Sequence, residues 1–138
     1  MIYLKKSEYC AIIKQAKDEF DHECCGFLAG TKKNGNIYID KVFPMKNTDN
    51  SSEHFSMEPK EQFEKIKSIR SFGMEMLGNY HSHPYSPSRP SEEDKRLSFD
   101  PNVIYSILSL QNKEVPVLNM FKVIKNENYV EKLQYEIV

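Results

Sequence analysis

The sequence predicts an α/β fold in a single domain, on the basis of two hydrophobic spacings and the chain length. Apolar residues recur at helical spacing between residues 7 and 20, at Tyr9, Ile13, Ala16 and Phe20. Ser7 precedes them and is a favourable N-cap, so we expect an amphipathic helix there. Residues 37–39 alternate as a half-buried strand does, and 138 residues suffice for one hydrophobic core. We therefore expect one domain over residues 1–138.

The other expected elements are separated by turn residues. Further strands are predicted at residues 24–30, 74–81, 103–110, 117–125 and 130–138. A polar turn at residues 32–36 joins the first of these to the alternating strand as a hairpin, and another at residues 126–128 joins the last two. Pro59 suits the first turn of a second helix that Gly73 would end, and a short helix is expected over residues 91–99. This pattern supports an α/β fold without fixing the strand order.

Charge and hydropathy argue against nucleic acid and membranes as partners. The formal net charge is −1, and 28% of the residues are charged, as on an ordinary protein surface. No apolar run reaches the roughly 20 residues that a membrane-spanning helix needs. The N-terminal sequence MIYLKKSEY also lacks the order of charged, apolar and small residues that marks a signal peptide. We therefore expect a cytoplasmic protein that binds neither nucleic acid nor membrane.

The cysteines do not indicate a disulfide framework. Cys10, Cys24 and Cys25 are odd in number and two are adjacent, which fits neither a set of disulfides nor a spaced C-x-x-C zinc knuckle. We expect buried, reduced thiols. A thiol nucleophile is the alternative, but no histidine is assigned to activate either Cys24 or Cys25.

A pair of histidines gives the strongest indication of function. His81 and His83 are two residues apart at the end of a predicted strand, so their side chains project to the same side. A catalytic zinc ion takes three protein ligands and keeps a fourth position for water, so a third ligand must come from elsewhere. Prolines at positions 84, 87 and 90 stiffen a loop that can return the chain to Asp94, the candidate third ligand.

Asp94 also has a purely structural interpretation. Ser91 with an acid three residues later is a pattern of helix N-termini, in which the serine caps the helix. The joint pattern of H-S-H-P, six residues and then S-x-x-D is expected by chance only on the order of 10⁻⁵ times in an ordinary chain. The joint pattern therefore favours a metal ligand over a cap alone.

These residues carry a resemblance to a known family. The run H-S-H-P-Y-S-P-S-R-P-S-E-E-D, residues 81–94, resembles the signature of the JAMM, or MPN-plus, metallopeptidases. The upstream run E-C-C-G-F-L-A-G, residues 23–30, resembles the family segment that begins with a catalytic glutamate. Residues 54–59, H-F-S-M-E-P, resemble the strand that leads into the family's central helix.

The resemblance implies a fold, a metal and roles for particular residues. The implied fold is a mixed, mostly antiparallel sheet flanked by helices, with the site at one end of the sheet. One Zn²⁺ ion per chain would be held by His81, His83 and Asp94. Glu23 would be the general base that activates water and then protonates the leaving amine, and Ser91 would donate a hydrogen bond to the oxyanion.

The resemblance also implies a substrate class, with alternatives. Short bacterial relatives are associated with ubiquitin-like sulfur-carrier proteins, so we expect hydrolysis of an amide bond at the Gly-Gly C-terminus of such a carrier. A deubiquitinase-like isopeptidase acting on another substrate remains an alternative, as does a non-catalytic MPN scaffold, although every ligand position is filled. Zinc-dependent nucleobase deamination would need H-x-E and P-C-x-x-C, which are absent. The sequence does not indicate an oligomeric state.

Overall fold

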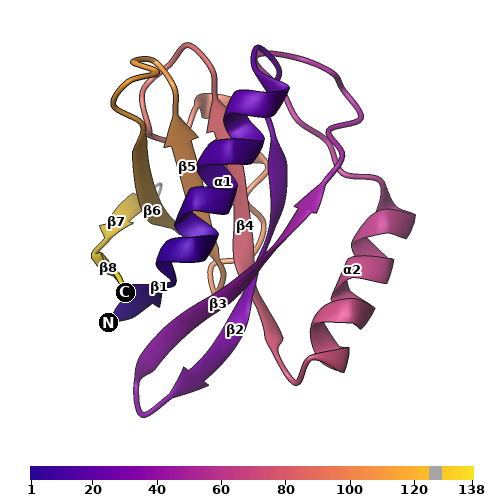
Figure 1. Cartoon of the computed structure of the whole chain (residues 1–138), viewed down its shortest axis with the longest axis vertical. Helices are drawn as coiled ribbons and strands as arrows, with labels where there is room; N and C mark the ends of the chain where they lie inside the picture. The colour runs from indigo at the N-terminus through magenta and orange to yellow at the C-terminus, as the bar shows by residue number, and fades with distance from the viewer. Residues whose placement is uncertain (125–128) are drawn as a thin grey trace.

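The computed structural model describes residues 1–124 and 129–138 and shows one mixed sheet with helices on both faces (Figure 1). Its strands are β1 (Ile2–Leu4), β2 (Cys25–Lys33), β3 (Asn36–Met45), β4 (Glu75–His83), β5 (Ile104–Ser109), β6 (Val117–Ile124), β7 (Tyr129–Leu133) and β8 (Tyr135–Ile137). Its helices are α1 (Lys6–Glu19), α2 (Pro59–Ser71) and α3 (Glu92–Arg96). The strand order is β7-β6-β5-β4-β2-β3-β1-β8. The predicted α/β class is confirmed.

Antiparallel pairs predominate in this sheet, as expected. β2 pairs antiparallel with β3 and β4, and β6 pairs antiparallel with β5 and β7. Parallel pairs join β4 to β5, and β1 to both β3 and β8. The parallel pair of β4 and β5 matters most for function, because the carboxyl ends of both strands meet at one edge and bring His83 beside Ser109.

Two apolar clusters hold α1 and α2 on opposite faces of the sheet. α1 buries Ile12 in a cluster that includes Leu28 of β2 and Tyr80 of β4. α2 buries Ile69 in a second cluster with the alternate side chains of β2, Cys25, Phe27 and Ala29. Successive side chains of a strand point to opposite faces, so β2 contributes to both clusters. The central strands are therefore covered on both sides and are well placed to hold a precise site.

Several element ends differ from the prediction. Ser7 lies inside α1, and Lys5 occupies the N-cap position without a side-chain cap, so the predicted cap is wrong. The helix expected over residues 91–99 ends at Arg96, where the Ser98 hydroxyl donates to the Asp94 carbonyl at 2.5 Å. Pro59 does lie in the first turn of α2, as predicted.

The two edges of the sheet account for the remaining differences. β1 has no counterpart among the predicted strands, because three residues are too few to show an alternation. The strand expected over residues 130–138 is divided, because β8 leaves the neighbourhood of β7 and pairs with β1. The turn predicted at residues 126–128 lies outside the described residues.

The backbones of β4 and β5 approach closely at Gly78. A Cβ atom built there would lie 2.0 Å from the carbonyl oxygen of Ile104. Only glycine fits without moving one of the two strands, and β4 carries both histidines.

Replacing this glycine should damage the fold severely. We expect Gly78→Ala to lower the free energy of unfolding by at least about 3 kcal/mol, since overpacked methyl groups force backbone shifts. Chemical denaturation followed by circular dichroism measures the change. Gly35→Asn is a suitable control, because Gly35 has φ +80 and open space around it, and asparagine tolerates that conformation. A Gly78→Ala protein as stable as this control would contradict the close approach.

Candidate metal centre

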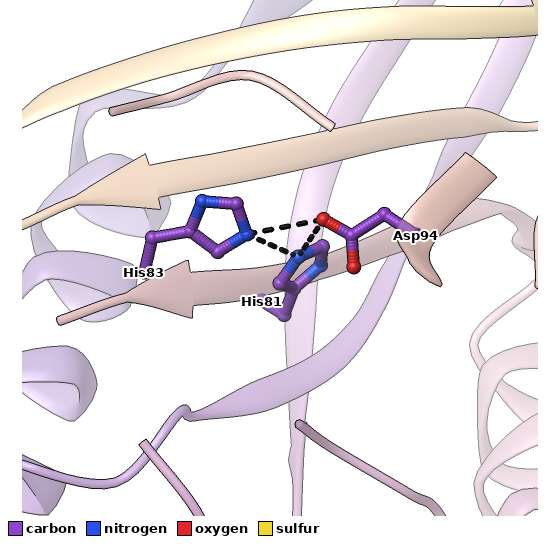
Figure 2. A group of neighbouring side chains, drawn as sticks. All are labelled: His81, His83 and Asp94. Atoms are coloured by element: carbon purple, nitrogen blue, oxygen red, sulfur yellow. Dashed lines mark hydrogen bonds and ion pairs between the residues drawn. The ribbon is translucent and has the colours of Figure 1, made fainter. Parts of the chain in front are cut away.

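The side chains of His81, His83 and Asp94 converge at the carboxyl end of β4 (Figure 2). His81 Nε2 lies 3.1 Å from His83 Nε2 and 3.2 Å from Asp94 Oδ2. His83 Nε2 lies 3.1 Å from the same carboxylate oxygen. The histidines come from one strand, whereas the aspartate comes from α3 after the proline-containing loop. The structure thus brings together the three residues that the sequence nominated.

This geometry and donor set fit a metal ion. Two atoms that both bind a tetrahedral zinc ion at about 2.0–2.1 Å lie roughly 3.3 Å apart, close to the separations found here. Two imidazoles and a carboxylate form the three-ligand set of catalytic zinc sites, with a fourth position left for water. The imidazole nitrogens also favour zinc over magnesium or calcium, which prefer oxygen ligands.

His83 is held by the loop that follows it. Its Nδ1 lies 2.9 Å from the carbonyl oxygen of Pro87. In the tautomer that donates from Nδ1 to this oxygen, Nε2 faces the cluster with a lone pair free to bind a metal. The loop is itself fixed to β5, because the Ser109 hydroxyl donates to the Ser86 carbonyl at 2.6 Å and the Ser88 hydroxyl donates to the Ile107 carbonyl at 2.5 Å. The ring of His83 is therefore oriented before any metal binds.

His81 is positioned by stacking instead. Its ring lies 4.5 Å from the ring of Phe55, at an angle of 24°. Among the described residues its Nδ1 has no hydrogen-bond partner. Burial lowers the pKa of His81, against the opposing effect of Asp94, so the imidazole is neutral and able to donate a lone pair.

One oxygen of Asp94 joins the metal cluster to the start of α3. Asp94 Oδ2 accepts from the backbone amide of Ser91 at 2.9 Å, and the Ser91 hydroxyl accepts from the Asp94 amide at 3.0 Å. The capping interpretation of Asp94 is confirmed, and because the capping box forms beside the candidate metal cluster, it is compatible with a ligand role. Burial opposes ionisation of Asp94, but its close contacts with the His81 and His83 imidazoles and the hydrogen bond from the Ser91 backbone amide hold its pKa well below the usual value. The aspartate is thus anionic near neutral pH.

Glu23 is buried on the same face of the sheet as the histidines. Cys25 pairs with His81, and continuing this register places Glu23 opposite His83. Its side chain is 3% exposed, and in the part of the chain described here its Oε1 has no hydrogen-bond partner. Burial, followed by the negative charges of Asp94 and other acids, raises the pKa of Glu23 to about 9. A cation at the ligand cluster would lower that pKa and let this carboxyl group exchange a proton.

Ser91 is exposed at the start of α3. Its oxygen accepts from the Asp94 amide, which leaves the hydroxyl hydrogen available for a further bond. The cap and the predicted oxyanion contact are therefore compatible. The oxyanion role stays a prediction.

Asn47 supports the site and was not singled out by the sequence. It is 4% exposed, and its amide donates to the carbonyls of Glu23 at 3.0 Å and His54 at 2.9 Å. Its oxygen accepts from the amides of Asp49 and Ser56 at 3.0 and 3.1 Å. The loop that carries Phe55 is thus tied to the backbone of Glu23 through one side chain. An asparagine in a polar loop gives no signal of this in a single sequence.

The remaining histidines and cysteines play no part in the metal cluster. The His54 imidazole contacts the carboxyl group of Glu93, and His22 lies on the surface 4.0 Å from Asp21. Cys24 and Cys25 are buried free thiols as predicted, whereas Cys10 is exposed, which corrects the prediction for that residue. Burial raises the pKa of Cys24 to about 12 and raises the pKa of Cys25 as well. Neither buried thiol is an effective nucleophile near neutral pH.

Comparison with known proteins assigns the chain to the class of JAB domains. Residues 5–122 match the family of prokaryotic homologs of the JAB domain, and the chain belongs to that family. It is 24% identical to the CysO-cysteine peptidase of Mycobacterium tuberculosis over 114 residues. This alignment covers 83% of this chain and 77% of that protein. It is 31% identical to the desampylase of Haloferax volcanii over 88 residues. This alignment covers 63% of this chain and 62% of that protein.

Solved structures agree with this assignment. A solution structure of a protein from Desulfitobacterium hafniense superposes with a TM-score of 0.91 at 40% identity, over 100% of this chain and 93% of that one. A crystal structure of a JAB1/MPN domain protein from Archaeoglobus fulgidus superposes with a TM-score of 0.63 at 21% identity, over 99% of this chain and 98% of that one. The predicted JAMM/MPN family and fold are therefore confirmed. No helix among the described residues is long and apolar enough to cross a membrane.

Removing the Asn47 side chain should destabilise the loop beside the metal cluster. We expect Asn47→Ala to lower the free energy of unfolding by about 2–3 kcal/mol, because buried carbonyl and amide groups lose their partners. Denaturation curves measure this change. Asn102→Ala, at an exposed asparagine, is the control and should change stability by less than about 0.5 kcal/mol. Equal effects in the two variants would contradict the central role of Asn47 in this loop.

The cysteines should differ in their reaction with an alkylating reagent near neutral pH. The thiols with raised pKa values remain protonated and buried, so only the exposed Cys10 should be modified in the folded protein. Mass spectrometry should show a single adduct in the native state and adducts at all three cysteines in denaturant. Rapid native modification of Cys24 would contradict the burial and reopen a cysteine mechanism.

Proposed function

We propose that this protein is a zinc-dependent metallopeptidase that hydrolyses an amide or isopeptide bond at the Gly-Gly C-terminus of a ubiquitin-like sulfur-carrier protein. One observation carries the proposal: three ligand atoms converge within 3.2 Å of one another, while the buried Oε1 of Glu23 on the same face of the sheet has no hydrogen-bond partner among residues 1–124 and 129–138. A scaffold has no need for an unpaired buried carboxyl group, whose burial is costly.

The names of the relatives support the same chemistry. A CysO-cysteine peptidase and two desampylases, from Haloferax volcanii and Pyrococcus furiosus, are among the proteins that this chain resembles. Together they favour a peptidase that removes a group from a small ubiquitin-like protein. We also propose that residues 1–138 form the one catalytic domain, because both histidines lie on a strand of the single sheet and the segments next to that strand carry Glu23, Ser91 and Asp94.

The proposed mechanism assigns a separate task to each nominated side chain. A zinc ion held by His81, His83 and Asp94 would supply Lewis-acid chemistry, polarising the scissile carbonyl and lowering the pKa of water. Glu23 takes the proton from the attacking water and later delivers it to the leaving amine. The Ser91 hydroxyl donates a hydrogen bond to the oxygen that becomes negatively charged.

The division of roles between the two carboxyl groups follows from the electrostatics of the site. Glu23 has a raised pKa, so its carboxylate is a better proton acceptor than that of Asp94, which has a lowered pKa and stays anionic. Two carboxyl groups whose pKa values are shifted in opposite directions suit two roles, one in proton transfer and one as a fixed negative charge. We therefore assign proton transfer to Glu23 and metal binding to Asp94.

The test combines metal content with cleavage of a carrier protein extended beyond its Gly-Gly terminus. Wild type should bind one zinc ion and cleave the extension. Glu23→Gln should keep zinc but lose at least about a hundredfold in kcat, the scale of general acid–base catalysis. Asp94→Asn keeps an oxygen that can cap α3 but loses the anionic ligand, so it should lose zinc without unfolding.

The controls make each failure informative. Glu114→Gln replaces an exposed glutamate in another loop and should match wild type in both measurements. Full activity of Glu23→Gln would refute the general base, and stoichiometric zinc in Asp94→Asn would refute the third ligand. Zinc without cleavage of any carrier would exclude this substrate class, and absence of zinc would favour the scaffold alternative.

A further inference from the structure

The main chain around Glu23 is held at three consecutive polar groups. The Glu23 amide donates to the carbonyl of Ser51 at 2.7 Å, and the Glu23 carbonyl accepts from the side-chain amide of Asn47 at 3.0 Å. The next amide along the chain, that of Cys24, donates to the hydroxyl of Ser82 at 2.8 Å. By contrast, Oε1 of the Glu23 side chain has no hydrogen-bond partner in the part of the chain that the structure describes. The backbone of this residue is thus fixed, whereas one oxygen of its side chain is left free.

The contact from Ser82 comes from the strand that carries both histidines. Ser82 lies between His81 and His83 in β4 and is fully buried, at 0% exposed. Because successive side chains of a strand alternate, the two imidazoles point to one face of the sheet and the Ser82 hydroxyl to the other. On its other side β4 is bonded to β5, where Ser82 pairs with Leu108. One central strand therefore sets the positions of both histidines and of the hydroxyl that holds the chain next to Glu23.

The hydroxyl of Ser82 takes the place of a regular sheet hydrogen bond. Residues opposite each other in a hydrogen-bonded antiparallel pair exchange two bonds between their main-chain N–H and C=O groups. The Ser82 amide donates to the Cys24 carbonyl at 3.0 Å, but the return bond from the Cys24 amide goes to the Ser82 hydroxyl. The regular pairing of β2 with β4 accordingly ends at Cys25 and His81. Glu23 thus lies just outside the regular sheet, at a place that the reach of one serine side chain defines.

We propose that Ser82 is a positioning residue for the general base. Its hydroxyl holds the main chain of Glu23 at a fixed separation from β4, and so places the Glu23 carboxyl group relative to the three candidate ligands. The proposal rests on the proposed function and adds a residue that acts through Glu23 without touching the substrate. Without the hydroxyl, the Cys24 amide either loses its partner or moves toward the Ser82 carbonyl, and both changes displace Glu23.

Loss of the Ser82 hydroxyl has two separate consequences. A buried amide left without a partner lowers the stability of the fold. A proton-transfer group displaced by about 1 Å also slows the reaction, on the order of a hundredfold. A serine that only satisfied a buried amide would show the first effect alone. The experiments therefore have to detect the second effect, the displacement of Glu23, independently of stability.

The first experiment compares Ser82→Ala with Ser82→Thr in cleavage of a carrier protein extended beyond its Gly-Gly terminus. We expect Ser82→Ala to keep its zinc and a KM within about twofold of wild type, while kcat falls at least about tenfold. Ser82→Thr keeps the hydroxyl, so its kcat should return to within about threefold of wild type. A higher KM with unchanged kcat in Ser82→Ala would overturn the positioning role.

Ser106 provides a matched control. It is a buried serine of β5 that pairs with Tyr80, and it lies on the same face of the sheet as Ser82. Among residues 1–124 and 129–138 its hydroxyl has no hydrogen-bond partner. Ser106→Ala removes the same atom without depriving an amide of its partner, so it should match wild type in kcat and in melting temperature. Equal losses of kcat in the two alanine variants would indicate a general disturbance of the core and overturn the proposal.

A double variant tests whether Ser82 acts through Glu23. Glu23→Gln removes the proposed base, so the turnover that remains does not depend on where that carboxyl group lies. Adding Ser82→Ala to Glu23→Gln should therefore change kcat by less than about twofold, whereas the same change in wild type costs at least about tenfold. Additive losses would show that Ser82 affects turnover by another route, which would refute the positioning role while leaving the proposed function intact.

NMR spectroscopy of the metal-free protein gives a readout that needs no substrate. Ser82→Ala should speed hydrogen exchange at the buried Cys24 amide at least about tenfold more than at the amides within β2, and it should shift the carbon signal of the Glu23 carboxyl group. Ser106→Ala should do neither. If wild type cleaved no carrier, the proposed function would fail, and these two signals would still decide whether Ser82 positions Glu23. Unchanged signals in Ser82→Ala would refute the proposal in either case.

Discussion

The carboxylate of Asp94 is the constraint on which the site depends. One oxygen accepts from the Ser91 amide and lies 3.1–3.2 Å from the Nε2 atoms of both histidines. A five-residue helix has little stability of its own, since helix nucleation is costly. The capping box gives this short helix a defined start, and the same oxygen fixes that start against β4. The same Asp94 carboxylate therefore stabilises both the start of the helix and the ligand cluster.

The rest of the structure surrounds this contact with fixed partners. The loop after His83 is attached to β5 by the hydroxyls of Ser88 and Ser109, and the loop before α2 is attached to the Glu23 backbone by Asn47. Buried polar groups that are fully paired restrict motion, whereas unpaired ones are costly. In the described part of the chain, Oε1 of Glu23 has no partner beside this network, which is consistent with a group kept for chemistry.

Local pattern allowed much of the fold and site to be predicted. The spacing of His81 and His83 requires that both project from one face of a strand, whatever surrounds that strand. The serine and aspartate at residues 91 and 94 form a capping box because helix geometry brings these positions together. Helical periodicity located α1, Pro59 and Gly73 located α2, and turn residues separated the longer strands. All of these signals depend on residues close in the sequence. The short strand β1 was missed because its place depends on β3 and β8.

Residue identity and spacing along the chain thus determined the α/β class, the ligand pair and the nomination of Asp94, whereas Glu23 was nominated by the resemblance to the JAMM family. Three-dimensional packing decided the strand order, the pairing of β8 with β1, the role of Asn47 and the cavity that Phe55, His81 and Asp94 help to line. The physical reason is the range of the interactions. Periodicity and capping act over a few residues, whereas a hydrogen bond from Asn47 to Glu23, 24 residues apart, forms only when distant segments meet. A cavity likewise exists only between side chains that the fold has brought together.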